Sequence, residues 1–117
     1  MPLMIQTAGT HGSRRKHIRG ANAPSNAIII NARKLPNPYG ELGTDPKMSH
    51  VEHVQAFLRE KCPDKVDKLV ATGCKAIRNN QPVVVVCLYG RDRSKAIAQL
   101  IGDNFDSNEV YYEHRED

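Results

Sequence analysis

Four consecutive valines, Val83 to Val86, constrain the fold of this chain more than any other segment. Successive side chains of a strand point to opposite faces, so a run that is apolar at every position has both of its faces buried. Ala27 to Ala32, which contains three consecutive isoleucines, is a second run of this kind. The two runs predict an α/β fold with a small, mostly parallel sheet covered by helices.

The rest of the chain supplies two further strands and three helices. Leu3 to Ala8 is a short apolar run, and Val110 to Tyr112 follows a turn, so both are expected to be strands. Apolar residues at helical spacing predict three helices. The first ends before Cys62, and the second is capped by Asp64. The third begins at about Arg93 and includes Phe105 on the side that faces the core. The order β–β–α–α–β–α–β is typical of a single α/β domain over residues 1–117.

The composition excludes several classes of protein. Hydrophobic residues make up 39% and charged residues 26% of the 117 positions, which is ordinary for a globular chain. Three cysteines without zinc spacing predict a reducing, cytoplasmic setting, and no segment resembles a secretory signal or a membrane span. We expect neither a metal nor a cofactor, and the net charge of +4 favours anionic partners.

The chemistry is expected where the valine run ends. A loop between a buried strand and a helix N-terminus binds anions, because its N–H groups and the helix dipole favour negative charge. Here the loop has the spacing Cys-x5-Arg-Ser, in which Gly90 permits close backbone approach, Arg93 can bind an oxyanion through two N–H groups, and Arg91 adds a second cation. The predicted anion site consists of Cys87, Leu88, Tyr89, Gly90, Arg91, Asp92, Arg93 and Ser94.

This loop pattern is shared by proteins that use the cysteine differently. It resembles the active-site loop of cysteine-dependent phosphatases, in which a thiolate attacks phosphorus, and it is similar to the loop of rhodanese-like domains. On that alternative Cys87 and Arg93 would be catalytic. However, Val86 stands where the phosphatases usually have His, no acid loop is recognisable, and the rhodanese loop is usually one residue shorter.

A third resemblance covers nearly the whole chain. The C-terminal domain of the RNase adapter protein RapZ family has a first strand and glycine similar to Met4 to Gly9. Its Asp-x-Arg-x-Leu-Pro-Asn-Pro motif resembles Asn31 to Pro38, and its Thr-Gly-x-Asp segment resembles Gly43 to Asp45. Its phosphate loop is similar to Val86 to Ser94, and its terminal His-Arg to His114-Arg115. Several motifs in the same order are more specific than one loop.

The resemblance implies a binding domain and not a catalyst. In the family this domain holds an amino-sugar phosphate, contacts small regulatory RNAs and self-associates, and it follows a P-loop domain that this sequence does not include. A phosphorylated small molecule, RNA and a second copy of the chain, as in a dimer, are therefore the expected partners, and no membrane is expected. Carried over by position, the pocket would contain Cys87, Gly90, Arg93 and Ser94, the opposing wall Asn31, Arg33 and Asn37, and the closing residues His114 and Arg115.

The chain also departs from the family at the pocket. Asn31 stands where the family has an acidic residue that could hold a ligand amine. Leu88, Tyr89 and Asp92 replace Thr, Gly and His of the family's loop. These replacements change the space and the charge beside the phosphate, so the ligand is expected to differ from that of the family.

A basic segment follows the first strand. Arg14, Arg15, Lys16, His17 and Arg19 place five potential cations within six residues, and no aromatic residue lies among them. Such a segment binds nucleic-acid phosphates in a salt-dependent way without base stacking, although a solvated surface loop explains it equally well. The predicted RNA-binding residues are Arg14, Arg15, Lys16 and Arg19.

Overall fold

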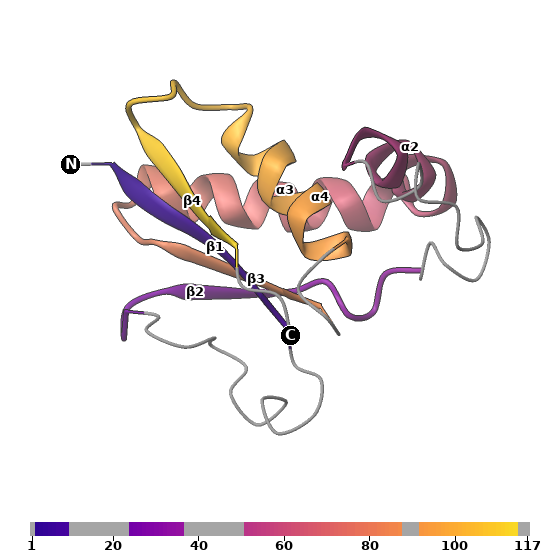
Figure 1. Ribbon diagram of the computed structural model, residues 1–117, viewed down its shortest axis with the longest axis horizontal. Coiled ribbons are helices and arrows are strands. Elements are labelled where there is room, and N and C mark those ends of the chain that lie inside the picture. Colours follow the sequence, from indigo (N-terminus) through magenta and orange to yellow (C-terminus); the bar gives the residue numbers. More distant parts are fainter. Residues whose placement is uncertain (1, 10–23, 37–50, 88–91, 115–117) are drawn as a thin grey trace.

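A four-stranded, all-parallel sheet with three helices forms the fold (Figure 1). The computed structural model describes residues 2–9, 24–36, 51–87 and 92–114. The strands stand in the order β2-β3-β1-β4, and every neighbouring pair is parallel. The elements are β1 Leu3–Gly9, β2 Ile28–Asn31, α2 Val51–Lys61, α3 Pro63–Arg78, β3 Val83–Cys87, α4 Arg93–Gly102 and β4 Val110–His114. The predicted α/β fold and its element order are confirmed.

The handedness of parallel connections explains where the helices lie. The chain moves from β2 to β3 through α2 and α3, and from β3 across β1 to β4 through α4, in the same direction along the sheet. Because parallel crossovers are right-handed, two that move in one direction lie on one face. The main core cluster accordingly combines side chains of all three helices with one face of the strands. Val84 and Val86 point to the other face and are also fully buried.

Close packing of α3 and α4 against the sheet depends on a glycine. A Cβ atom at Gly73 in α3 would collide with the side chain of Ile101 in α4 and would lie 3.1 Å from Cδ1 of Ile30 in β2. No larger residue fits between these two side chains without moving them. Gly73 therefore lets α3 approach both the sheet and the neighbouring helix.

Two element boundaries differ from the sequence prediction. Cys62, and not Asp64, occupies the N-cap of α3, because Pro63 takes the first helical position and Asp64 falls in the first turn. The predicted third helix was too long: α4 ends at Gly102, and Phe105 lies beyond it in a turn where its N–H donates to the Gly102 carbonyl over 3.0 Å. Phe105 still packs against the core, with the Arg78 guanidinium 5.7 Å from its ring centroid.

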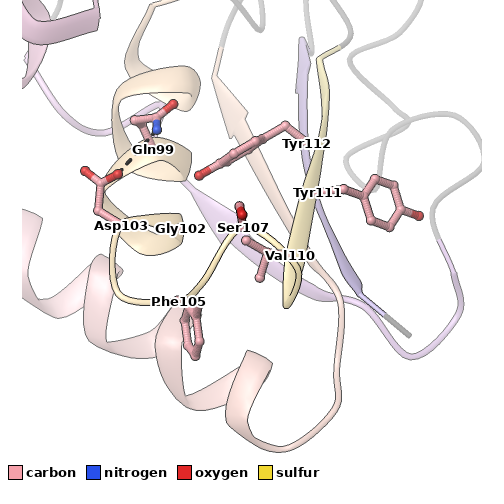
Figure 2. A pocket seen from close by; sticks show the side chains of 8 residues that line it. All are labelled: Gln99, Gly102, Asp103, Phe105, Ser107, Val110, Tyr111 and Tyr112. Atoms are coloured by element: carbon pink, nitrogen blue, oxygen red, sulfur yellow. Dashed lines mark hydrogen bonds between the residues drawn. The ribbon is translucent and has the colours of Figure 1, made fainter.

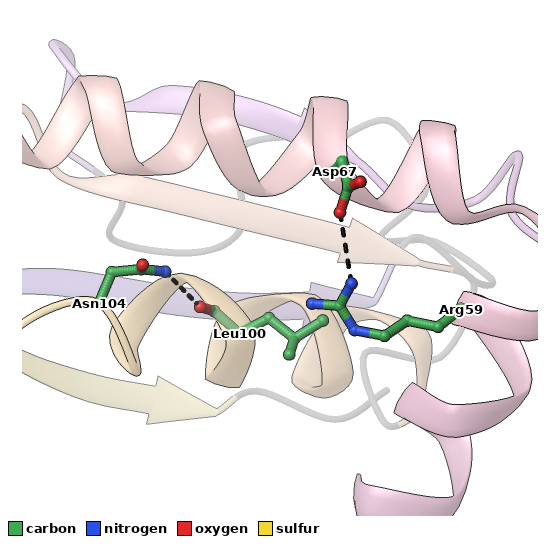
Figure 3. A network of polar contacts seen from close by, with 4 residues as sticks. All are labelled: Arg59, Asp67, Leu100 and Asn104. Carbon is green, nitrogen blue, oxygen red and sulfur yellow. Dashed lines mark hydrogen bonds and ion pairs between the residues drawn. The ribbon is translucent and has the colours of Figure 1, made fainter.

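Polar contacts at the surface of the helices include an ion pair and a hydrogen bond at a helix end (Figure 3). Arg59 Nη1 at the end of α2 lies 3.3 Å from Asp67 Oδ1 in α3, and their side chains are 48% and 68% exposed. An ion pair this exposed contributes about 0–1 kcal/mol to stability. Asn104 Nδ2 donates to the Leu100 carbonyl over 2.9 Å and satisfies one carbonyl at the end of α4. Within the described part of the chain, no helix is long and apolar enough to span a bilayer.

Candidate functional site

The carboxyl ends of the four strands collect most of the described residues that were predicted to bind the ligand. Parallel strands end at one edge of a sheet, so Gly9, Asn31, Cys87 and His114 all terminate strands at this edge. The helix α4 begins there at Arg93. We call this end of the molecule the carboxyl edge.

The strand order marks one position along this edge. The chain leaves β1 toward β2 on one side and leaves β3 toward β4 on the other, and these two strands are neighbours. In open α/β sheets, ligands bind in the crevice outside the carboxyl ends of neighbouring strands whose connections run in opposite directions along the sheet, as these two do. Gly9 and Cys87 pair directly across β1 and β3, so the Cys-x5-Arg-Ser loop leaves the sheet at this crevice.

Cys87 and Ser94 face each other across the ends of this loop. The Cys87 Sγ atom lies 3.3 Å from the Ser94 Oγ atom, at hydrogen-bond distance for a thiol and a hydroxyl. Cys87 is 2% exposed and Ser94 is fully buried. The pair joins the last residue of β3 to the first turn of α4 and fixes both ends of the loop.

Arg93 has a structural role that the sequence did not predict. Its side chain reaches the segment after β2, where Nη1 donates to the main-chain carbonyls of Arg33 and Leu35 over 2.9 Å each. Both hydrogens of Nη1 are used in these bonds. Among the described residues, Nε and Nη2 make no further hydrogen bond, and these two nitrogens form the side of a guanidinium that can bind two oxygens of one oxyanion. Arg93 is 9% exposed.

The segment that Arg93 holds is a tight turn from Asn31 to Leu35. Asn31 Oδ1 accepts bonds from the Arg33 main-chain N–H over 2.9 Å and from Arg33 Nε over 3.1 Å. The Ala32 N–H donates to the Val86 carbonyl over 2.7 Å, and the Leu35 N–H donates to the Ala32 carbonyl over 3.2 Å. The turn is therefore bonded to β3 through its main chain and to α4 through Arg93.

His114 is held at the other side of the edge. Its Nδ1 atom lies 2.8 Å from the Thr7 hydroxyl of β1, and its ring stacks on Tyr112 with centroids 5.8 Å apart. The histidine side chain is exposed, whereas Thr7 is fully buried. Residues from β1 and β4 thus orient the imidazole beside the end of β1.

The beginning of α4 gives the edge a mixed charge. Asp92 occupies the N-cap, is 9% exposed and makes no side-chain hydrogen bond to the helix N–H groups. The first turn of α4 contains no acidic residue. Arg93 and Lys95 lie in the first turn of α4, and Arg33 and Lys34 lie in the turn that Arg93 holds, so basic residues outnumber acidic ones among the described residues of the two segments.

The structure thus brings together one part of the predicted site. Asn31, Arg33, Cys87, Asp92, Arg93, Ser94 and His114 lie at the carboxyl edge. The remaining predicted residues lie outside the described part of the chain: Leu88, Tyr89, Gly90, Arg91, Asn37 and Arg115 of the pocket, and Arg14, Arg15, Lys16 and Arg19 of the basic segment.

Two residues of the edge were missed from the sequence. Thr7 orients His114, and the Leu35 carbonyl accepts from Arg93. The signal for Thr7 was a hydroxyl beside Gln6 in a buried, mostly apolar strand, since a buried polar side chain needs a partner. No sequence signal indicates which main-chain carbonyls an arginine will bind.

A separate groove of about 590 Å³ lies at the other end of α4, between that helix and β4 (Figure 2). Tyr112 points from β4 toward α4, whereas Tyr111 points away to the other side of the strand. Burial raises the pKa of the Tyr112 hydroxyl, and the nearby Asp103 carboxylate raises it further. Asp103 Oδ1 accepts a bond from Gln99 Nε2 over 3.3 Å. This groove holds none of the residues predicted from the sequence.

Comparisons with known proteins identify no family. No protein-family model matches the chain, and no curated protein is significantly similar to it. The resemblance to the RNase adapter family, together with the RNA binding and self-association that it implies, therefore stays a prediction.

Proposed function

We propose that the domain binds a phosphate-bearing ligand at the carboxyl edge, without chemical conversion. The observation that carries this proposal is the position of Arg93, a nearly buried guanidinium at the start of α4, at the carboxyl edge beside the turn that follows β2. Nη1 is fixed by two carbonyls, so the side formed by Nε and Nη2 is held in place before any ligand arrives. A group fixed in advance loses little conformational entropy on binding.

The nature of the ligand follows from the charge of the edge. A helix N-terminus favours negative charge, and Arg33, Lys34 and Lys95 add cations near Arg93. Phosphate matches the planar fork of a guanidinium better than a monatomic anion such as chloride does, because two N–H groups can bind two of its oxygens. A phosphorylated small molecule, such as a sugar phosphate or a nucleotide, is the ligand class that this combination favours.

The direct test is calorimetric titration with inorganic phosphate and with glucose 6-phosphate. Arg93→Ala should weaken binding at least about tenfold, since hydrogen bonds to charged groups are worth about 1.5–3 kcal/mol. Arg59→Ala is a matched control, because it removes the same charge from an exposed ion pair on α2. Equal affinities for wild type and Arg93→Ala would refute the proposal.

A cysteine-dependent enzyme is the second candidate, and one contact favours it. The Ser94 hydroxyl lies 3.3 Å from Cys87 Sγ, where it could donate to a thiolate. Burial raises the pKa of the Cys62 and Cys74 thiols, which disfavours the thiolate form in both. Against catalysis, Cys87 is only 2% exposed, and an attacking sulfur must reach phosphorus directly.

Hydrolysis of p-nitrophenyl phosphate separates the two candidates. The binding proposal predicts no turnover above background for wild type and no difference between wild type and Cys87→Ser. Turnover that disappears in Cys87→Ser, while Cys74→Ser retains it, would establish the enzyme instead.

RNA binding by the basic segment is a further part of the proposal. Gly9 ends β1 directly beside Cys87, so the chain leaves toward Arg14 from the same edge that holds Arg93. Replacing Arg14, Arg15 and Lys16 together by Ala should weaken RNA binding and lower the slope of log K against log salt by about 2–3. An unchanged slope would exclude this segment from any RNA contact.

A further inference from the structure

We infer that the ligand carries two anionic groups, one bound at Arg93 and the other at Arg33, and that Asn31 is the residue that positions Arg33. This inference deepens the proposed function and rests on it. It is carried by the turn from Asn31 to Leu35, in which one residue connects the two guanidinium groups.

The first observation is the way in which Arg33 is fixed. Arg33 is exposed, and an exposed arginine side chain ordinarily samples many rotamers. Here Asn31 Oδ1 accepts from both the main-chain N–H of Arg33 and its Nε, at 2.9 and 3.1 Å. One carboxamide oxygen therefore restrains the backbone and the guanidinium of the same residue.

The second observation is what this restraint leaves available. Nε of Arg33 is used by Asn31, so the end formed by Nη1 and Nη2 is the part that can bind two oxygens of an anion. Within the described segments, these two nitrogens make no hydrogen bond to the protein. The exposed guanidinium is thus held in one orientation with the Nη1–Nη2 donor pair unused.

The third observation connects this group to Arg93. Nη1 of Arg93 donates to the carbonyl of Arg33 itself, so the two cations are joined through a single residue. Both guanidinium groups therefore belong to one turn region, where anions bound beside them offset their like charges. Arg93 presents its Nε–Nη2 side and Arg33 its Nη1–Nη2 end, so each offers a separate pair of donors. A ligand with two anionic groups uses both pairs.

Titration with inorganic phosphate and with pyrophosphate at one ionic strength tests the inference. Wild type should bind pyrophosphate at least about tenfold more tightly than phosphate, because a second charged contact forms. Arg33→Ala should lower the pyrophosphate affinity about tenfold and change the phosphate affinity less than about twofold. The substitution keeps the main-chain carbonyl that Arg93 binds, so the anchoring of Arg93 is retained. Fructose 1,6-bisphosphate against fructose 6-phosphate repeats the comparison for sugar ligands.

Lys34→Ala is the matched control. Lys34 is the adjacent exposed cation, and its removal changes the net charge by the same amount. Its effect on pyrophosphate should be below about threefold, as expected for a screened, unspecific charge.

Each outcome decides between the proposals. If Arg33→Ala weakens phosphate and pyrophosphate equally, one phosphate bridges both arginines and the two-anion ligand is excluded. If pyrophosphate binds no more tightly than phosphate, or Lys34→Ala equals Arg33→Ala, the inference fails while phosphate binding at Arg93 stands. If neither anion binds wild type, the proposed function fails as well.

The role of Asn31 is tested by a double-mutant cycle. Asn31→Ala should lower the pyrophosphate affinity in wild type, because Arg33 loses its restraint, and should have no effect on pyrophosphate in the Arg33→Ala background. The phosphate affinity of Asn31→Ala should stay within about twofold of wild type. A general loss of structure would weaken the binding of both anions and would not affect pyrophosphate alone. Additive effects of the two substitutions would overturn the positioning role.

Discussion

The two ends of α4 carry opposite charge. At its N-terminal end, Arg93 and Lys95 lie in the first turn of the helix, and Arg33 and Lys34 lie in the turn that Arg93 holds. At its C-terminal end, the groove beside β4 is bordered by Asp103, and residues 96–112 contain three carboxylates and no lysine or arginine, while the Arg78 guanidinium lies over the Phe105 ring. Basic residues thus predominate in the segments at the N-terminal end of α4, and acidic residues predominate in the segment that follows its C-terminal end.

On the proposed function, open volume alone does not mark the binding site of an anion. The groove offers about 590 Å³, yet its carboxylate repels phosphate, and the helix dipole is negative at that end. The carboxyl edge has fixed donors and the positive end of the same helix. Changes at the two ends should consequently have separable effects on stability and on binding.

The largest effect is expected at Arg93. Arg93→Ala removes the donor of two carbonyls, one of them buried, and should lower the free energy of unfolding by about 2–4 kcal/mol. Arg33→Ala, which leaves both carbonyls bonded, should cost less than about 0.5 kcal/mol. Urea denaturation of the two variants measures this difference, and equal losses would show that the bonds of Arg93 do not hold the turn.

A substitution that causes a steric clash at the other end of α4 should have the next largest effect on stability. A Cβ atom at Gly102 would collide with the Tyr112 hydroxyl, so Gly102→Ala should cost about 1–3 kcal/mol of stability. Adding Tyr112→Phe removes the colliding oxygen and should restore part of the loss. Phosphate affinity should stay unchanged in both variants, and a parallel loss of affinity would contradict the separation of the two ends.

The pH dependence of stability provides a smaller test of the groove. The pKa of Tyr112 is raised in the folded state by burial and by Asp103, so the unfolded chain loses this proton first as the pH rises. The contribution of Tyr112 to stability is therefore complete below the ordinary tyrosine pKa of about 10 and is lost as the pH rises through the folded pKa. Thermal unfolding between pH 9 and 11 should show a weaker alkaline loss in Tyr112→Phe than in wild type. Asp103→Asn should lower the pKa of Tyr112, and identical slopes in all three proteins would refute this coupling.

The smallest effect is expected for a substitution in the groove, measured as a change in phosphate affinity. Asp103→Asn removes a carboxylate from the far end of α4, and screening by salt reduces its influence at the carboxyl edge. Calorimetry should find the phosphate affinity of this variant within about twofold of wild type. A tenfold gain would show that phosphate binds in the groove once its charge is removed.

The sequence predicted the fold because its signals are local. Val83 to Cys87 and Ile28 to Asn31 are strands as expected, and their apolar character also predicted parallel pairing. The helix boundaries were less accurate, because Phe105 continues the helical spacing of Ile101 although the chain has already turned. Because the strands are parallel, Asn31, Cys87 and His114 lie at one edge of the sheet.

The internal bonding of the site could not be predicted. Arg93 reaches carbonyls 60 and 58 residues earlier in the chain, and Thr7 and His114 are 107 residues apart. Such contacts depend on the strand order β2-β3-β1-β4, which no residue pattern specifies. The sequence indicated an arginine for the ligand, and only the structure showed that half of its guanidinium holds the protein together.

Titration of the ¹⁵N-labelled wild-type protein with inorganic phosphate, followed through amide chemical shifts, tests the central claim most directly. Shift changes that saturate and are confined to Asn31, Arg33, Cys87, Arg93 and Ser94 are the predicted result. Changes centred on Gln99, Asp103 and Phe105, or no saturable change at the carboxyl edge, would contradict it.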